Sequence, residues 1–158
     1  MLRALAAALG KDFRLLARDH VGLIFDHTER NQPNAFAERL DTIDLSVQHN
    51  RRLGERHRIA WGGGYRHASD RVDNGPAFGF LPGDMRLHWG NVFAQDEIAL
   101  ADTLKATVGL KLEDNHYTGV EDLPNVRLAW QPSNDRLVWG SLARTVRAPS
   151  RIDRDLYS

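Results

Sequence analysis

The feature that most constrains the fold of this sequence is a long-range alternation of apolar and polar residues. In the clearest run, TLKATVGLKLED at 103–114, every second position is apolar: Leu104, Ala106, Val108, Leu110 and Leu112. Successive side chains of a β-strand point to opposite faces, so a period of two indicates a strand with one apolar and one polar face. The chain is therefore expected to be built from strands whose two faces meet different surroundings.

The same alternation recurs along most of the chain. Three further runs have a clear apolar face, formed by Ile43, Leu45 and Val47, by Ile59, Trp61 and Tyr65, and by Val126, Leu128 and Trp130. In HWGNVFAQDEIAL, 88–100, either face can be the apolar one. We predict an all-β fold, an antiparallel up-and-down meander of about seven long strands. The strands are placed at 12–26, 39–52, 57–69, 85–100, 103–113, 124–131 and 136–146.

Strand and connection lengths separate a soluble sheet from a membrane barrel. Globular strands average about 5–6 residues, whereas a strand that crosses a bilayer needs about 9–11, and several runs here are of the longer kind. Outer-membrane barrels combine short periplasmic turns with longer extracellular loops. We expect short turns at 53–56, 101–103 and 131–135 to alternate with long loops at 27–38, 69–84 and 114–123.

Aromatic side chains support a barrel in the membrane. Six of them lie near the ends of the expected strands, where interfacial girdles form: Trp61, Tyr65, Trp89, Phe93, Trp130 and Trp139. In a soluble sheet the same residues would form cross-strand aromatic pairs.

Composition excludes several classes of function. The 158 residues carry 21 Lys and Arg against 21 Asp and Glu, so no basic field indicates nucleic acid as a partner. With no cysteine there are no disulfides or thiolate metal sites. The seven histidines show no metal-ligand spacing, and no catalytic or phosphate-loop motif is present. We therefore expect no enzyme, no cofactor and no resident metal.

Three segments together resemble the barrel strands of TonB-dependent outer-membrane receptors. They are FAQDEIAL at 93–100, GLKLEDNHYTGVEDLPNVRLAWQP at 109–132 and WGSLARTVRAPSR at 139–151. An upstream stretch, 26–49, is similar to the same barrels, so the resemblance covers most of the chain from about Asp12. The positions that carry it are Gln95, Asp96, Glu97, Gly109, Lys111, Glu113, Tyr117, Thr118, Gly119, Pro124, Arg127, Ala129, Trp130, Arg147, Pro149 and Ser150.

The resemblance implies a transport receptor in the outer membrane of a Gram-negative cell. Its partners would be outer-membrane lipid, a small-molecule or metal-chelate cargo, and the TonB complex, which supplies energy through a plug. The cargo would be a scarce nutrient such as a ferric siderophore, haem, cobalamin or an oligosaccharide. The polar face would line the lumen, with Arg144 pointing inward and Pro149 ending the pairing of the last strand. Tyr117, Arg147 and Arg151 are the expected cargo contacts in extracellular loops.

The sequence also departs from that family. Receptors of this kind have about 22 strands around a plugged lumen, whereas residues 1–158 offer about a third of that, with no plug, TonB-contacting segment or export signal. We therefore expect a partial barrel, incomplete at both ends and unstable in lipid by itself. One alternative is a soluble β-sandwich or barrel acting as a binding module, with its first and last strands paired. An enzyme on an all-β scaffold is the other.

Overall fold

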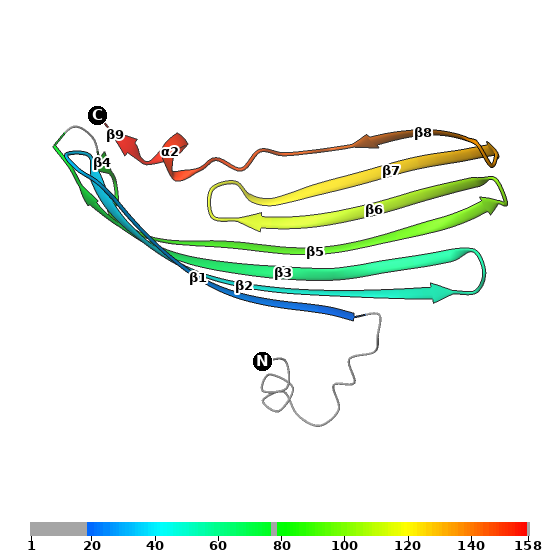
Figure 1. The fold of residues 1–158 in the computed structure, drawn as a ribbon, viewed down its shortest axis with the longest axis horizontal. Coiled ribbons are helices and arrows are strands. Elements are labelled where there is room, and N and C mark those ends of the chain that lie inside the picture. The colour runs from blue at the N-terminus through cyan, green and yellow to red at the C-terminus, as the bar shows by residue number, and fades with distance from the viewer. Residues whose placement is uncertain (1–18, 77–78, 158) are drawn as a thin grey trace, which may run out of the picture.

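Most described residues belong to one antiparallel sheet (Figure 1). The computed structural model describes residues 19–76 and 79–157. The sheet follows the chain order β1, β2, β3, β5, β6, β7 and β8, so the predicted all-β meander is confirmed. These strands are β1 (Asp19–Gln32), β2 (Phe36–Leu53), β3 (His57–Asn74), β5 (Asp84–Ala101), β6 (Leu104–Asn115), β7 (Gly119–Ser133) and β8 (Arg136–Ala143).

A small second unit lies at one end of the sheet. It pairs β4 (Gly79–Phe80) with β9 (Leu156–Tyr157), and the helix α2 (Arg151–Arg154) leads into β9. Because β4 pairs with β9, β3 and β5 are neighbours in the main sheet although β4 lies between them in sequence. No helix in the ranges 19–76 and 79–157 is long and apolar enough to cross a membrane.

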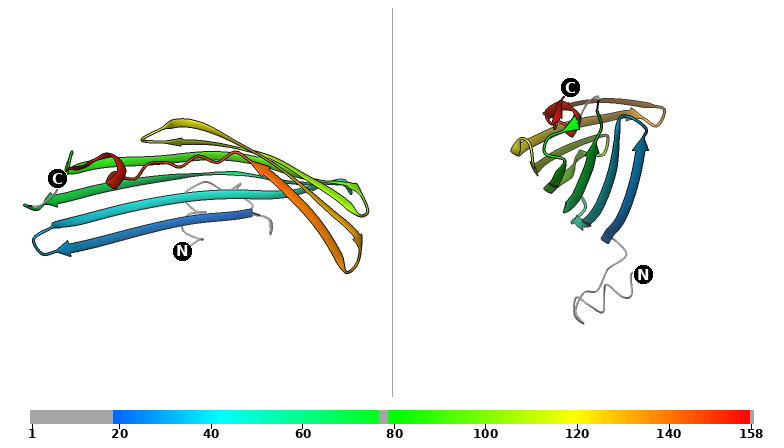
Figure 2. Two further views of the ribbon diagram at one scale, coloured as in Figure 1. Left: turned by 90° about the horizontal axis from the view of Figure 1, so that it is seen from above. Right: turned by 90° about the vertical axis from the view of Figure 1, so that its left-hand side faces the viewer.

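The sheet is curved, and its outer strands do not meet (Figure 2). Among the described residues β1 pairs only with β2, and β8 only with β7. Among the described residues only five hydrophobic side chains are buried, Ala68, Val72, Phe80, Leu87 and Ala106, whereas Leu142 is 80% exposed. A soluble sandwich or barrel requires a larger core and paired end strands, and β1 and β8 of the described sheet are not paired with each other.

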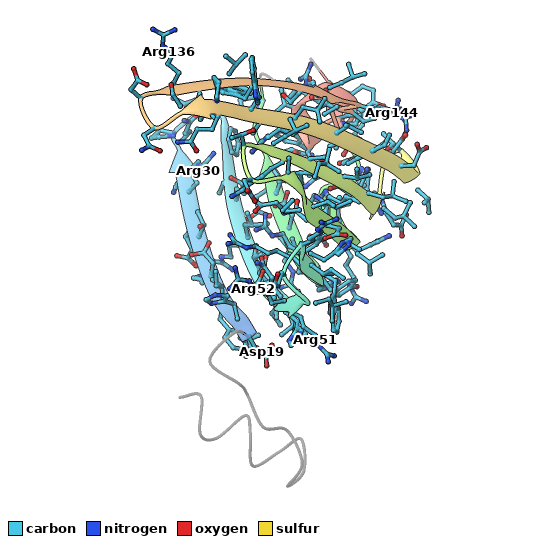
Figure 3. All side chains as sticks on the ribbon, turned by 90° about the vertical axis from the view of Figure 1, so that its right-hand side faces the viewer. Asp19, Arg30, Arg51, Arg52, Arg136 and Arg144 are labelled. Atoms are coloured by element: carbon cyan, nitrogen blue, oxygen red, sulfur yellow. The ribbon has the colours of Figure 1, made fainter. Side chains whose placement is uncertain are left out.

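The strand pairing places the apolar residues of the alternating runs on one side of the sheet. Leu23 pairs with Leu45, and Leu45 pairs with Tyr65, so the apolar faces expected from the alternation of these strands lie on the same side. Adjacent residues such as Arg51 and Arg52 lie on opposite sides (Figure 3). We call this side the apolar face; it carries Val21, Leu23, Phe25, Ile43, Leu45, Val47, Ile59, Trp61, Tyr65, Val92, Ala94, Ile98, Leu104, Ala106, Val108, Leu110, Leu112, Val126, Leu128, Trp130, Val138 and Leu142.

We call the opposite side of the sheet the polar face. The pairing of β3 with β5 shows which residues of 88–100 lie on each face. Trp89 pairs with Arg66 and Phe93 with Gly62 on the polar face, whereas Val92 lies on the apolar face. Trp139 also lies on the polar face. The expectation that Trp89, Phe93 and Trp139 belong to a lipid-facing girdle is therefore wrong. Apolar side chains occur on both faces of β5, which removes the period of two that would have assigned them.

The apolar residues drift along the strands from one strand to the next. The hydrogen-bonded ladder that starts at Leu23 passes through Leu45, Tyr65, Gly90 and Asp114 and reaches β7 at Val120. The apolar run of β7 lies further along the strand, at Val126 to Trp130. A band that crosses tilted strands must shift in this way, as in a barrel with shear.

The sequence-based prediction of long loops at 27–38 and 114–123 is wrong. The strands on either side of 27–38 continue and leave only 33–35 as a turn, and those around 114–123 leave only 116–118. A longer connection, 75–83, remains within 69–84 and contains β4. The strands run on because their pairing continues where the apolar face gives way to polar residues such as Glu29, Arg39 and Arg71, so the alternation ends although the ladder does not.

The end of the last expected strand also differs. The last strand ends at Ala143 rather than 146, and Arg144 makes one more backbone bond to the carbonyl of Pro124. Pro124 has no N–H to return, so the ladder stops there and not at Pro149. Of the first expected strand, 12–26, the part at 12–18 lies outside the described residues.

Four strands extend well beyond the apolar face. β2, β3 and β5 each have 18 residues, about 59 Å of strand at ~3.3 Å per residue, against an apolar band of about 25 Å in outer-membrane barrels. Figure 1 shows β1, β2, β3 and β5 running past the β6–β7 turn toward β4. We call this part, residues 26–42, 66–76 and 79–89, the extension. Residues 144–157 run back toward it and end at β9.

A charge on the apolar face should be far more costly than the same charge one residue away. Val108→Arg is expected to destabilise the protein by about 2–4 kcal/mol in a lipid bilayer, the cost of Arg near the bilayer midplane. Thr107→Arg, on the polar face of the same strand, should cost less than about 1 kcal/mol, as a lumen substitution does. Equilibrium unfolding in lipid vesicles measures both, and equal costs would contradict the assignment of the faces.

Candidate functional site

The polar face is lined by paired charges. Arg66 contacts Asp44 at 2.7 Å between neighbouring strands, and Lys111 contacts Glu113 at 2.6 Å. Both pairs are partly exposed, so they remain hydrated and contribute little to stability. This arrangement suits a water-filled interior better than a protein core.

Two hollows lie on this face and share Arg66 and Trp89. The lower hollow has a volume of about 410 Å³ and is lined also by Asp44, Gln48, Asn91, Phe93 and Glu113. The upper hollow, about 320 Å³, lies between the extension and α2 and is lined also by Phe36, Leu40, Phe80, Leu87, Arg151 and Ile152. We call Arg66 and Trp89 the bridging pair, because they are direct cross-strand partners.

Glycine in β3 makes room for the aromatic ring of the lower hollow. A Cβ at Gly62 would lie 2.2 Å from the Val47 carbonyl oxygen and 3.0 Å from the Phe93 ring. Only glycine avoids both contacts at this position. The glycine run at 62–64 therefore allows close packing between strands.

A buried arginine fixes the C-terminal segment over the upper hollow. Arg151 donates from Nη1 to Asp70 Oδ2 at 2.7 Å and from Nη2 to the Pro82 carbonyl, with its guanidinium 5.2 Å from the centre of the Phe80 ring. Arg151 is 8% and Asp70 4% exposed. Since the charge of each is compensated only by partners inside the protein, we call this contact the latch.

Tyr117 joins the latch from the β6–β7 turn. Its hydroxyl donates to Asp155 Oδ2 at 2.9 Å, and the same carboxylate oxygen lies 3.5 Å from Arg151 Nε. The turn that presents it is closed by the side chain of Asn115, which accepts from the backbone N–H groups of Tyr117 and Thr118. Burial, and then the hydrogen bond to Asp155, raise the pKa of Tyr117 to about 12.

Arg147 lies apart from the latch. Its side chain is 83% exposed and donates to both oxygens of Asp153, at 3.0 Å each. Asp153 and Ser150 form the capping box that starts α2, and the hydrogen bond from the Ser150 backbone N–H, the largest effect, lowers the pKa of Asp153. The structure thus brings Tyr117 and Arg151 together and leaves Arg147 on the surface. Their contact with cargo stays a prediction.

Sequence reasoning did not identify the bridging pair or Asp70 as site residues. The alternation of Ile59, Trp61 and Tyr65 puts Arg66 on the opposite side of β3, but the alternation of β5 does not reveal that Trp89 is its cross-strand partner. Asp70 lies in the extension, where alternation has ended. In the part of the chain that the structure describes, no three His, Asp or Glu side chains are arranged to hold a metal ion.

Comparison with known proteins gives one match. The family model described as TonB dependent receptor-like, beta-barrel, matches residues 9–158, a range that includes every strand and both hollows. Neither the curated proteins nor the solved structures contain a significant match to the chain.

Removing the latch arginine should free the C-terminal segment. Arg151→Met leaves Asp70 buried without its counter-charge, a loss of about 3–5 kcal/mol for a buried pair. The amide of Leu81, which donates to the Asp155 carbonyl at 2.9 Å, should then exchange faster with deuterium. Arg147→Met is the control, because an exposed pair contributes about 0–1 kcal/mol. Equal exchange in the two variants would show that the latch does not hold the segment.

Tyr117 should ionise at a higher pH than an ordinary tyrosine. Its raised pKa means that the folded state favours the neutral phenol, so this stabilisation is complete below pH 10 and is lost as the pH rises through about 12. Titration of the phenolate absorbance should show a step near pH 12 that is missing in Tyr117→Phe. The prediction fails if the two proteins differ only by a step near pH 10.

Proposed function

This chain belongs to the TonB-dependent receptor-like β-barrel family, and we propose that it serves the TonB-driven uptake of a scarce nutrient across the outer membrane. Members of the family are outer-membrane transport receptors rather than enzymes. The cargo we propose is a metal chelate or cofactor-sized nutrient, such as a ferric siderophore, haem or cobalamin, and the cell is Gram-negative. Energy would come from the TonB complex through a plug in the lumen.

The observation that carries this proposal is the pair of hollows on the polar face. Their volumes, about 410 and 320 Å³, lie within the range of small-molecule sites. Trp89 and Phe93 offer flat apolar surfaces, and Arg66 and Asn91 offer hydrogen-bond donors beside them. A nutrient with flat rings and oxygen acceptors would find both kinds of contact here.

The ends of the strands support an orientation. The turns at 54–56, 102–103 and 134–135 are short, as periplasmic turns are, whereas the other end carries the extension, β4 and α2. We infer that the extension faces outward. Tyr117, Arg147 and Arg151 then lie on the extracellular side, where Arg147, being exposed, would be the first to reach cargo.

Uptake by whole cells tests the proposal. Cells that express the protein should accumulate one member of a radiolabelled panel, ferric siderophores, haem and cyanocobalamin, and should lose this accumulation when TonB is deleted. Trp89→Ala should weaken binding of that cargo about tenfold, the loss of one stacked aromatic contact. Trp139→Ala, on the polar face but outside both hollows, is the matched control. Unchanged uptake without TonB would overturn the proposal.

A further inference from the structure

A third hollow of the polar face lies at the end of the sheet that carries the short turns, away from the extension. Its volume is about 440 Å³, within the range of small-molecule sites. Its polar-face lining includes four side chains with hydrogen-bond donors, Asn50, Arg52, Arg58 and Gln95, and one carboxylate, that of Glu97. We call it the turn-end hollow.

The turn-end hollow brings two like charges together. Arg52 of β2 and Arg58 of β3 are direct cross-strand partners, and side chains in that relation have their Cβ atoms about 4.5–5.5 Å apart. Like charges directly opposite each other destabilise a sheet. Arg51 points to the other side and takes no part in this contact (Figure 3). An anion between the two guanidinium groups would turn this repulsion into attraction.

The carboxylate of the hollow does not compensate both arginines. Glu97 Oε1 lies 3.6 Å from Arg58 Nη1 and 3.7 Å from Lys105 Nζ, so these two cations share a single oxygen. Arg52 makes no hydrogen bond or ion pair within residues 19–76 and 79–157. Three cations thus face one carboxylate, which leaves a net charge of +2.

The lower hollow shows how the same face balances its charges elsewhere. There Arg66 lies 2.7 Å from Asp44, and Lys111 lies 2.6 Å from Glu113, one carboxylate for each cation. The excess of cations is therefore not a general property of the polar face. It indicates that the turn-end hollow takes its missing negative charge from a bound anion.

We propose that the turn-end hollow binds a small oxyanion with two or more negative charges, a phosphate ester or a dicarboxylate, between Arg52 and Arg58. Each guanidinium can donate two parallel hydrogen bonds to such a group, and the amide of Gln95 lies in the same wall as a further donor. The site is additional to the two hollows of the proposed cargo site. It requires that the polar face lines an aqueous interior, but no particular cargo and no TonB complex.

Isothermal titration calorimetry tests the site. The protein, purified from outer membranes in detergent, is titrated with pyrophosphate, succinate and acetate at one ionic strength. At least one of the two multivalent anions should bind about tenfold more tightly than acetate, because it engages a second arginine through charge-assisted hydrogen bonds. The tighter of the two shows whether the site prefers phosphate or carboxylate groups.

Three variants separate a binding role from a structural one. Arg52→Gln should remove the preference over acetate and, without anion, should raise the melting temperature, because the repulsion from Arg58 is lost. Glu97→Gln should tighten binding of the preferred anion, because it removes the competing carboxylate. Arg136→Gln is the matched control: it removes an exposed arginine of β8 at the same end of the sheet and should bind like the unchanged protein.

Three results would overturn the proposal. They are equal binding of all three anions by the unchanged protein, equal losses in Arg52→Gln and Arg136→Gln, and a lower melting temperature of Arg52→Gln, which would give that arginine a structural role. Cargo uptake is not measured in this experiment, so failure of the site and failure of the transport function are distinguishable.

Discussion

The rest of the structure depends on the hydrogen-bonded ladder between strands. Lipid offers no partner to a backbone N–H or C=O, so each strand must have a neighbour on both sides or leave costly groups unpaired. Six adjacent pairs satisfy the interior of the sheet, from β1–β2 to β7–β8. Within the described residues β1 and β8 each pair on one side only, and we propose that their other edges join further strands of a barrel. A single slip of register would carry Leu45 or Val108 to the polar face, so the alternation and the ladder determine each other.

That ladder separates two chemistries on one sheet. The apolar side chains of one face contact lipid hydrocarbon instead of packing in a protein core. This explains why Leu142 can be 80% exposed in a folded protein. On the polar face, the paired charges and the two hollows remain accessible to water. In the extension the polar face carries buried apolar side chains such as Val72, Phe80 and Leu87. A second kind of contact, the buried pair of Arg151 and Asp70, fixes the end of the chain there.

The sequence predicted the strands and faces in proportion to how strongly each strand alternates. β6 and the middle of β2 have apolar residues on one face only, so both register and face were predicted. β5 carries Trp89 and Phe93 on one face and Val92 and Ala94 on the other. Only its pairing with the neighbouring strands shows which of these faces is the apolar face of the sheet. The sequence predicted long loops where the structure has only the short turns 33–35 and 116–118. Beyond the lipid the strands no longer need an apolar face, so the alternation is lost there although the strands remain paired. The partnership of Arg151 with Asp70 joins residues far apart in sequence, and no local pattern indicates it.

The central claim is that one face of this sheet contacts lipid and the other an aqueous interior. The chain contains no cysteine, so single cysteines can be introduced along β6 at successive positions from 104 to 113 and labelled with an environment-sensitive fluorophore in lipid vesicles. The account predicts that brominated lipid quenches the labels at the even-numbered positions, 104 to 112, and that iodide quenches those at the odd-numbered positions. Quenching by iodide at every position, or by neither agent with any period of two, would contradict it.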